Sequence, residues 1–158
     1  MNSHREIGVG LLGLGGIGAE VARVLIQKSD LISKQAGRPV ALSKVLVKDL
    51  KKPRTSSVSS ALLTTNPAEV LDNPEIDMVV ELIGGDTPAV DFLRNAIYQR
   101  KHVVTANKEI MARHGFDIMA LAMKNSVQVL FEASVGAGTP IISPLTRDLV
   151  ANNITSIR

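Results

Sequence analysis

The sequence predicts an α/β fold in which helices cover both faces of a doubly wound parallel sheet, giving three layers. Three observations predict this class. Apolar runs of strand length alternate with helical patterns along the chain, without internal repeats. Aromatic residues make up only 3% of the 158 residues and hydrophobic residues 45%, so the core is aliphatic, as in buried parallel sheets. A glycine-rich turn also joins the first strand to the first helix.

The first strand begins at Ile7 and ends at glycines in positions 13, 15 and 18, the G-x-G-x-x-G spacing of a dinucleotide-binding turn. Gly13 permits a tight turn, Gly15 lets the backbone approach a pyrophosphate, and Gly18 lets the helix pack close to the strand. The helix N-terminus then offers free N–H groups and partial positive charge to an anion. The residues expected at the pyrophosphate are Gly13, Leu14, Gly15, Gly16, Ile17 and Gly18.

The helix after this turn has apolar side chains at helical spacing, which predicts the face that packs on the sheet. They are Ile17, Val21, Val24 and Leu25. A strand–turn–helix corner without a ligand would show the same pattern, so the turn alone leaves dinucleotide binding open.

The second strand, Val40–Val47, follows a polar linker at Ser29–Pro39. In a dinucleotide fold the residue at the end of this strand faces the adenosine ribose, where an acidic side chain binds the ribose hydroxyls and repels a 2′-phosphate. Here Lys48 stands at the strand end with Asp49 beside it. Lys48 favours NADP, and Asp49 leaves NAD possible.

The loop after this strand is basic, with Asp49 as the only acidic neighbour of Lys48, Lys51, Lys52 and Arg54. The net charge of the chain is only +3, and no aromatic side chain lies in the loop to stack a base. We therefore expect no nucleic-acid partner, and either a solvated loop or a phosphate contact.

The middle of the chain predicts a short strand, a helix, a longer strand and a second helix. Glu81 interrupts the longer strand and is expected either at an exposed edge or in a hydrogen-bonded role. The elements are an excursion at Thr55–Ser60, a strand at Ala61–Thr65, a helix from Asn66-Pro67 to about Asp72–Pro74, a strand at Ile76–Ile83 ended by Gly84-Gly85, and a helix begun by Thr87-Pro88 with Leu93, Ala96, Ile97 and Arg100 on one face.

The last third continues the alternation. We expect a strand at His102–Thr105, a short helix at Glu109–Arg113 stopped by His114-Gly115, and a second helix at Phe116–Lys124 with Phe116, Met119, Ala120 and Met123 on one face. A strand at Val127–Glu132, a small-residue turn at Ala133–Gly138, a helix from Thr139-Pro140 to about Val150 and an extended segment at Ile154–Arg158 follow.

Ligands of such sheets bind beyond the carboxyl ends of the strands. The groups expected there are Gly13–Gly18, Lys48, Ile83–Gly85, Thr105–Lys108 and Glu132–Gly138. Lys108 could neutralise a substrate carboxylate or stabilise an alkoxide, and burial would suit it to acid–base chemistry. The histidines are weaker candidates: His102 as a packed strand residue, His114 at a helix end and His4 in the leader.

The composition excludes some chemistry. The chain has no Cys, which excludes disulfides, thiolate metal sites and a cysteine nucleophile. No apolar run is long enough for a membrane span, and Met1–Glu6 lacks the apolar core of a signal peptide. We therefore expect a soluble, cytoplasmic protein without a membrane partner.

Four segments together resemble the cofactor-binding domain of homoserine dehydrogenase, in the family's order and spacing. They are Gly8–Gly18 (GVGLLGLGGIG), Val79–Gly85 (VVELIGG), Lys101–Lys108 (KHVVTANK) and Phe131–Ile142 (FEASVGAGTPII). The resemblance implies a Rossmann-like fold and an NAD(P)-dependent oxidoreductase that interconverts aspartate-4-semialdehyde and homoserine, in the biosynthesis of threonine, methionine and isoleucine.

The resemblance also implies roles for single residues. Ile83, Gly84 and Gly85 would lie along the nicotinamide ribose, and Thr105 would be a further cofactor-binding residue. Lys108 would contact cofactor and substrate. The Glu132 carboxylate, with main-chain carbonyls of Val135, Ala137 and Thr139, would hold Na⁺ or K⁺. A glycine-rich turn with a structural Glu is the alternative for that last segment.

Members of this family are longer than this chain. The resemblance implies an NAD(P)-binding domain at residues 1–153, and a crossing at 154–158 into a substrate and dimerisation domain that carries a second catalytic lysine. The chain would then be a truncated part of a homodimeric enzyme, binding cofactor but transferring hydride poorly. A nucleotide-sensing module without catalysis and another dehydrogenase of small amino-acid-like substrates remain the alternatives.

Overall fold

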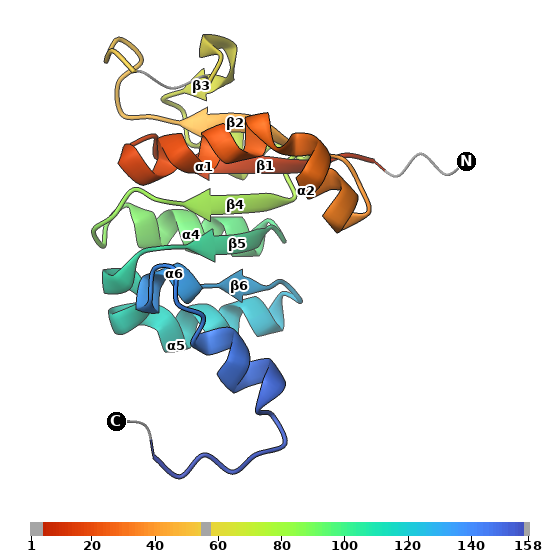
Figure 1. Cartoon of the computed structure of the whole chain (residues 1–158). Coiled ribbons are helices and arrows are strands. Elements are labelled where there is room, and N and C mark those ends of the chain that lie inside the picture. The colour runs from red at the N-terminus through yellow and green to blue at the C-terminus, as the bar shows by residue number, and fades with distance from the viewer. Residues whose placement is uncertain (1–4, 55–57, 157–158) are drawn as a thin grey trace.

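The computed structural model describes residues 5–54 and 58–156, which build one sheet with helices on both faces (Figure 1). All strand pairs are parallel, and the strand order is β3-β2-β1-β4-β5-β6. The strands are β1 (Ile7–Leu12), β2 (Val40–Leu46), β3 (Leu63–Thr64), β4 (Met78–Glu81), β5 (His102–Thr105) and β6 (Val129–Leu130). The chain runs outward from β1 to β3 and then crosses to β4, so the direction reverses between β1 and β4.

The helices are α1 (Gly16–Gln27), α2 (Ser29–Ala36), α3 (Ala68–Leu71), α4 (Ala89–Tyr98), α5 (Lys108–Lys124) and α6 (Glu132–Val135), with a 3₁₀ turn η1 (Ser60–Leu62) and a π-helical segment η2 (Pro144–Asp148). Helix α1 lies over one face of the sheet, and α4 and α5 lie behind it (Figure 1). The predicted doubly wound, three-layer α/β fold is therefore confirmed.

Each face of the sheet has its own apolar core. On one face Ala22 of α1 packs with Val9, Leu11 and Val45 of the central strands. On the other face Leu12 and Val79 pack with buried side chains of α3, α4 and α5, which are Val70, Leu71, Ala89, Val90, Leu93, Ala96, Ile97, Ile110, Ile118 and Ala122. Leu11 and Leu12 are both fully buried although they point to opposite faces, because helices cover both sides of β1.

The polar linker predicted at Ser29–Pro39 is wrong for most of its length, because Ser29–Ala36 forms α2. Gly37 ends this helix in the left-handed conformation at φ +70°, and Pro39 follows. Both are ordinary helix-stop signals. The segment contains few apolar residues and buries none of them fully, which is why its helical period is weak.

Residues 109–124 form one helix, α5, and the predicted break at His114-Gly115 is wrong. The predicted apolar face is also wrong. Phe116 and Met123 are 88% and 80% exposed, whereas Ile118 and Ala122 are buried. Apolar residues occur on two faces of this helix, so periodicity alone does not tell which one packs on the sheet.

Other differences are local. Ile17 is 65% exposed, so it does not belong to the packed face of α1. Arg100 lies beyond α4 with φ +59°, exposed to solvent. The sixth strand is only Val129–Leu130, the last helical segment begins after Ile141, and 154–156 have no regular structure. His4 and Thr55, Ser56 and Ser57 of the predicted excursion lie outside the described residues, as do 157 and 158.

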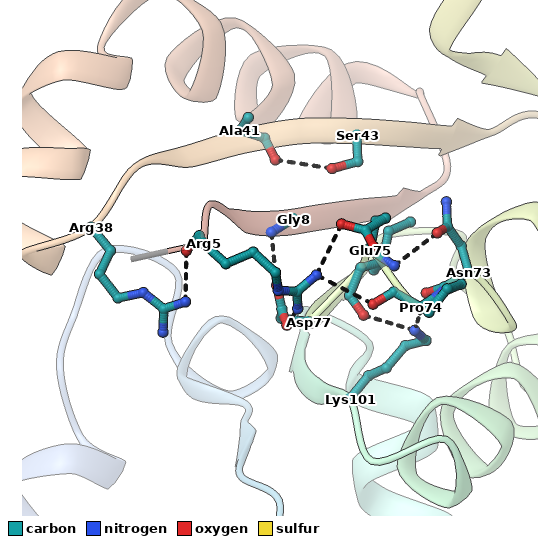
Figure 2. A network of polar contacts seen from close by, with 11 residues as sticks. Arg5, Gly8, Arg38, Ala41, Ser43, Asn73, Pro74, Glu75, Asp77 and Lys101 are labelled. Carbon is teal, nitrogen blue, oxygen red and sulfur yellow. Dashed lines mark hydrogen bonds and ion pairs between the residues drawn. The ribbon is translucent and has the colours of Figure 1, made fainter. Parts of the chain in front are cut away.

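A polar network closes the amino ends of β1, β4 and β5 (Figure 2). Asp77, which precedes β4, accepts a hydrogen bond from the Gly8 N–H at 2.9 Å and pairs with the Arg5 guanidinium. Lys101 is 4% exposed, and its ammonium donates to the carbonyls of Asn73 and Ile76 at 2.6 and 2.7 Å. Burial lowers the pKa of Lys101, and the nearby Asp77 opposes that shift. This edge of the sheet is therefore held together by the protein's own charges.

Candidate functional site

The glycine turn connects β1 to α1 at the carboxyl edge of the sheet. Gly13 has φ +101°, and the Leu82 carbonyl oxygen lies 2.9 Å from the position that a Cβ would take. The Gly13 N–H donates to the Leu46 carbonyl at 3.0 Å, which joins the turn to the end of β2. Any side chain at position 13 would therefore be strained by conformation and by contact.

The fold requires glycine at position 18 but not at position 15. Gly18 is buried, and a Cβ there would overlap the carbonyl oxygen of Gly13. This contact is the close helix–strand packing that the spacing predicts. A Cβ on Gly15 would meet nothing within 4 Å. The protein itself therefore does not require glycine at position 15, and open space lies beside its backbone.

The N-terminus of α1 faces this space. Gly15 is the N-cap and no side chain caps the helix, nor is there an acidic residue in its first turn. Gly15 and Gly16 are exposed together with Ile17, and Leu14 is half-buried. A helix start with exposed glycines and no capping side chain leaves its backbone N–H groups accessible to an anion.

The basic loop after β2 is bonded to itself. The Asp49 carboxylate accepts from the Lys51 N–H at 2.8 Å, and Arg54 donates to the Lys52 carbonyl at 2.9 Å. Lys48 is exposed at the carboxyl edge, beyond the end of β2. One carboxylate oxygen of Asp49 therefore accepts a hydrogen bond within the loop, whereas the Lys48 side chain is exposed to solvent.

Glu81 ends β4 and is 0% exposed. Its Oε1 accepts from the N–H groups of Ile83 and Gly84 at 2.8 and 3.3 Å, and its Oε2 accepts from the Thr105 hydroxyl at 2.6 Å. Of the two roles left open for Glu81, the hydrogen-bonded one is therefore correct. The carboxylate folds the loop at 83–85 back onto the strand end.

Thr105 and Asn107 extend these contacts to α5. The Thr105 hydroxyl accepts from the Asn107 N–H at 3.0 Å, and its carbonyl accepts from the Ser134 hydroxyl at 3.0 Å. The Asn107 side chain caps α5 by accepting from the Ile110 N–H at 3.1 Å, and it donates to the Gly85 carbonyl at 2.7 Å. The ends of β4 and β5, the loop at 83–85 and the start of α5 thus form one hydrogen-bonded unit.

Lys108 is the first residue of α5, directly after the buried Asn107. Its side chain is exposed. The burial expected to suit Lys108 to acid–base chemistry is therefore not provided by the described residues. Lys108 nevertheless lies at the carboxyl edge, near the loop at 83–85, because the preceding residue, Asn107, donates a hydrogen bond to the Gly85 carbonyl.

Among the described residues, neither His102 nor His114 is hydrogen-bonded to the glycine turn. His114 is in the middle of α5, not at a helix end as predicted, and its Nε2 lies 3.0 Å from Asp86. His114 and then Arg113 lower the pKa of Asp86. The Nδ1 atom of His102 accepts from the Gln128 N–H at 3.1 Å, and the residue is exposed, not packed.

Glu132 begins α6, and its carboxylate accepts hydrogen bonds from three backbone N–H groups further along the chain. The donors are Ile141, Ile142 at 2.8 Å and Ser143 at 2.9 Å. These bonds, led by the one from Ile141, lower the pKa of Glu132. Glu132 therefore anchors the segment that begins the last helix.

Sequence reasoning missed the contacts that connect the strand ends. Asn107 before a helix carries the ordinary N-cap signal, which would have marked 108 as the helix start. The bonds of Asp86 to α5 and of Ser134 to β5 have no local signal, because they join residues 27 to 29 positions apart.

A 3-2-1-4-5-6 parallel sheet with a tight glycine turn after β1, open space at its second glycine and an uncapped helix start defines a dinucleotide-binding domain of the Rossmann class. Residues 13–132 match the family described as the NAD binding domain of homoserine dehydrogenase. The chain belongs to this family, and the predicted resemblance is confirmed.

Named relatives agree with the family. The homoserine dehydrogenase of Bacillus subtilis is 42% identical over 153 residues, which are 97% of this chain and 35% of the relative. That of Neisseria gonorrhoeae is 40% identical over 154 residues, with the same coverage. The crystal structure of a homoserine dehydrogenase from Thiobacillus denitrificans matches with a TM-score of 0.84 and 46% identity, over 93% of this chain and 34% of the other.

The chain spans about a third of the length of these relatives. The matched part is the cofactor-binding part, and its ligand class is a nicotinamide dinucleotide. In the described part of the chain, no helix is long and apolar enough to cross a membrane. The same residues contain no group of three or more acidic or histidine side chains that could hold a metal ion.

Proposed function

We propose that this chain is the cofactor-binding part of a homoserine dehydrogenase that interconverts L-aspartate-4-semialdehyde and L-homoserine. The observation that carries the proposal is the glycine turn, in which Gly13 and Gly18 are demanded by the fold while Gly15 borders open space. A glycine that the fold does not need, at an uncapped helix start, fits a ligand that approaches the backbone there.

The nicotinamide cofactor supplies the hydride when it is bound. The residues of this chain bind and orient it. The turn at Gly13–Gly18 holds the pyrophosphate through the free backbone N–H groups at the start of α1, and Ile83–Gly85 lie along the nicotinamide ribose, supported from below by the buried Thr105. Lys108 contacts cofactor and substrate and stabilises the alkoxide charge from this half of the site.

NADP is the proposed cofactor, with NAD as the weaker alternative. The exposed Lys48 stands at the end of β2, where a 2′-phosphate would lie. The carboxylate of Asp49 already accepts from the Lys51 N–H, so it is partly used within the loop. A lysine charge attracts the dianionic phosphate, and its compact ammonium suits that contact.

A monovalent cation, Na⁺ or K⁺, is a second part of the proposal. Its ligands would be the Glu132 carboxylate and the carbonyls of Val135, Ala137 and Thr139, an all-oxygen set that suits a hard cation. Three of roughly four acceptor positions of the carboxylate are taken by N–H groups, which leaves one for a cation. We also include homodimerisation through the longer protein and a cytoplasmic location.

Calorimetric titration of the chain with NADPH and NADH tests the binding half of the proposal. We expect both to bind, with NADPH tighter. Absence of binding by either would contradict it.

A chimera tests the chemical half. This chain would replace the matched third of the Bacillus subtilis enzyme, and oxidation of homoserine by NADP⁺ would be followed by absorbance. We expect activity that is lost in Lys108→Ala. A chimera that binds NADPH but stays inactive, although folded, would favour a nucleotide-sensing module instead.

A further inference from the structure

The buried carboxylate of Glu81 has no cationic partner among the ion pairs of the described residues, and hydrogen bonds alone satisfy it. Burying a charge is costly unless several donors face it. Two backbone N–H groups and one hydroxyl do so here, from Ile83, Gly84 and Thr105. An apolar side chain at this strand end would be buried at a lower free-energy cost, so the carboxyl group calls for a functional or structural explanation.

The directions of the hydrogen bonds show which kind of side chain fits at position 81. The Thr105 hydroxyl accepts from the Asn107 N–H, so its proton is left to donate to Glu81. Backbone N–H groups donate to the other carboxylate oxygen. Donors therefore arrive from both sides, and only a group that accepts on both oxygens fits between them. A carboxyl group can do this, whereas an amide would turn a donor toward one side.

Two segments of the proposed site depend on this carboxylate. One is the loop at 83–85, where Gly84 and Gly85 have φ +79° and +72°. The other is the start of α5, because Asn107 is bonded to Thr105 and to the Gly85 carbonyl. A Cβ on Gly84 or Gly85 would meet nothing within 4 Å, so packing does not hold this loop. The hydrogen bonds of Glu81 and Asn107 hold it instead.

We propose that Glu81 is a positioning residue, which sets the loop at 83–85 against the start of α5 so that the nicotinamide end of the cofactor is held next to Lys108. It acts through Thr105 and Asn107 and does not touch the pyrophosphate turn. The inference rests on the proposed function, because that function assigns the loop at 83–85 to the nicotinamide ribose.

Glu81 should affect the binding of only one end of the cofactor. Losing the carboxylate should loosen the nicotinamide end and leave the adenosine end unaffected. NADPH carries both ends, whereas 2′-phospho-ADP carries only the adenosine end and the pyrophosphate, without the second ribose that the loop at 83–85 contacts. The emission of the reduced nicotinamide also reports on its surroundings, without catalysis.

The experiment compares Glu81→Gln with the unchanged 158-residue chain in titrations with NADPH and with 2′-phospho-ADP. We expect NADPH to bind about tenfold more weakly to the variant, the loss of hydrogen bonds to a charged group. Its bound emission should return toward that of free NADPH, while 2′-phospho-ADP binds within about twofold. Glu75→Gln, the same chemical change at the amino edge, should alter neither titration.

A second variant covers the case in which Glu81→Gln does not fold. Asn107→Ser keeps a helix-capping side chain but is too short to reach the Gly85 carbonyl. We expect the same selective loss for NADPH. Equal affinities and unchanged emission in a folded Glu81→Gln or Asn107→Ser would overturn the inference. If the unchanged chain binds neither ligand, the proposed function fails instead.

Discussion

The amino and carboxyl edges of the sheet differ in how many of their polar groups are hydrogen-bonded within the protein. At the amino edge, Arg5 pairs with Asp77, and Lys101 donates to two backbone carbonyls of the segment before Asp77, as Figure 2 shows. At the carboxyl edge, the start of α1 has no side-chain cap and borders open space at Gly15. Polar groups hold the fold at both edges, through Asp77 and Lys101 at one and Glu81 and Asn107 at the other, but only the carboxyl edge also has an uncapped helix start whose backbone donors could bind a ligand.

A cavity of about 390 Å³ lies at the amino edge, not at the glycine turn. Its lining includes Asp77 and Lys101. Both are already hydrogen-bonded to the protein, whereas the buried Nε of Arg38 in the same lining has no hydrogen-bond partner among the described residues. This cavity and the proposed dinucleotide site therefore lie at opposite edges of the sheet.

The largest effect is expected from Gly8→Ala at the amino edge. The added Cβ would overlap the carbonyl oxygen of Glu75, which belongs to backbone and has little freedom to move. We expect the free energy of unfolding to fall by about 3 kcal/mol. Urea unfolding measures it, and wild-type stability in this variant would mean that the edge is looser than described.

Lys101→Met comes next. The change leaves the carbonyls of Asn73 and Ile76 without their buried donor, and we expect a loss of about 2 kcal/mol in unfolding free energy. Lys34→Met, at an exposed position of α2, is the matched control and should be neutral. The affinity for NADPH should not change in folded Lys101→Met; a selective loss of binding would refute the division between the edges.

The sequence could predict the parts of this contrast that depend on local pattern. The glycine spacing predicts a tight turn at Gly13 and close packing at Gly18, and both have a backbone reason in the structure. The sheet class follows from the alternation of strands and helices. These features involve residues near in sequence, where spacing and conformation are directly linked.

The rest depends on contacts between distant segments. Asp77 and Gly8 are 69 positions apart, and Thr105 and Glu81 are 24 apart, so no window of sequence contains both partners. The buried face of α5 was mispredicted because Phe116 and Ile118 are equally apolar, and only packing against the sheet decides between them. Lys108 could be located at the carboxyl edge, but its exposure could not.

A smaller effect is expected from Lys48→Glu at the carboxyl edge. Reversing the charge at the end of β2 should weaken NADPH binding about tenfold and leave NADH binding nearly unchanged, because only NADPH carries the 2′-phosphate. Calorimetry with both cofactors measures the difference. Lys34→Glu has the same charge change on α2 and serves as the control. Equal losses for both cofactors would remove Lys48 from the phosphate contact.

The smallest effect concerns Glu132, whose pKa is lowered by N–H groups of Ile141, Ser143 and Ile142. A lowered pKa in the folded state means that the anchor stabilises above the ordinary carboxyl pKa, about 4.3. It is lost as the pH falls through the lowered value. We expect the NMR signals of these amides to titrate with a midpoint below 4.3, and Glu132→Gln to abolish the titration. A midpoint at or above 4.3 would contradict the anchor.

The central claim is that the carboxyl edge holds the dinucleotide at the glycine turn, and Gly15→Ala tests it most directly. The added methyl meets no protein atom within 4 Å, so the free energy of unfolding should stay within about 1 kcal/mol of the unchanged chain. The same methyl occupies space that the pyrophosphate needs, and NADPH should bind about thirtyfold more weakly or worse. Unchanged NADPH affinity in folded Gly15→Ala would contradict the account.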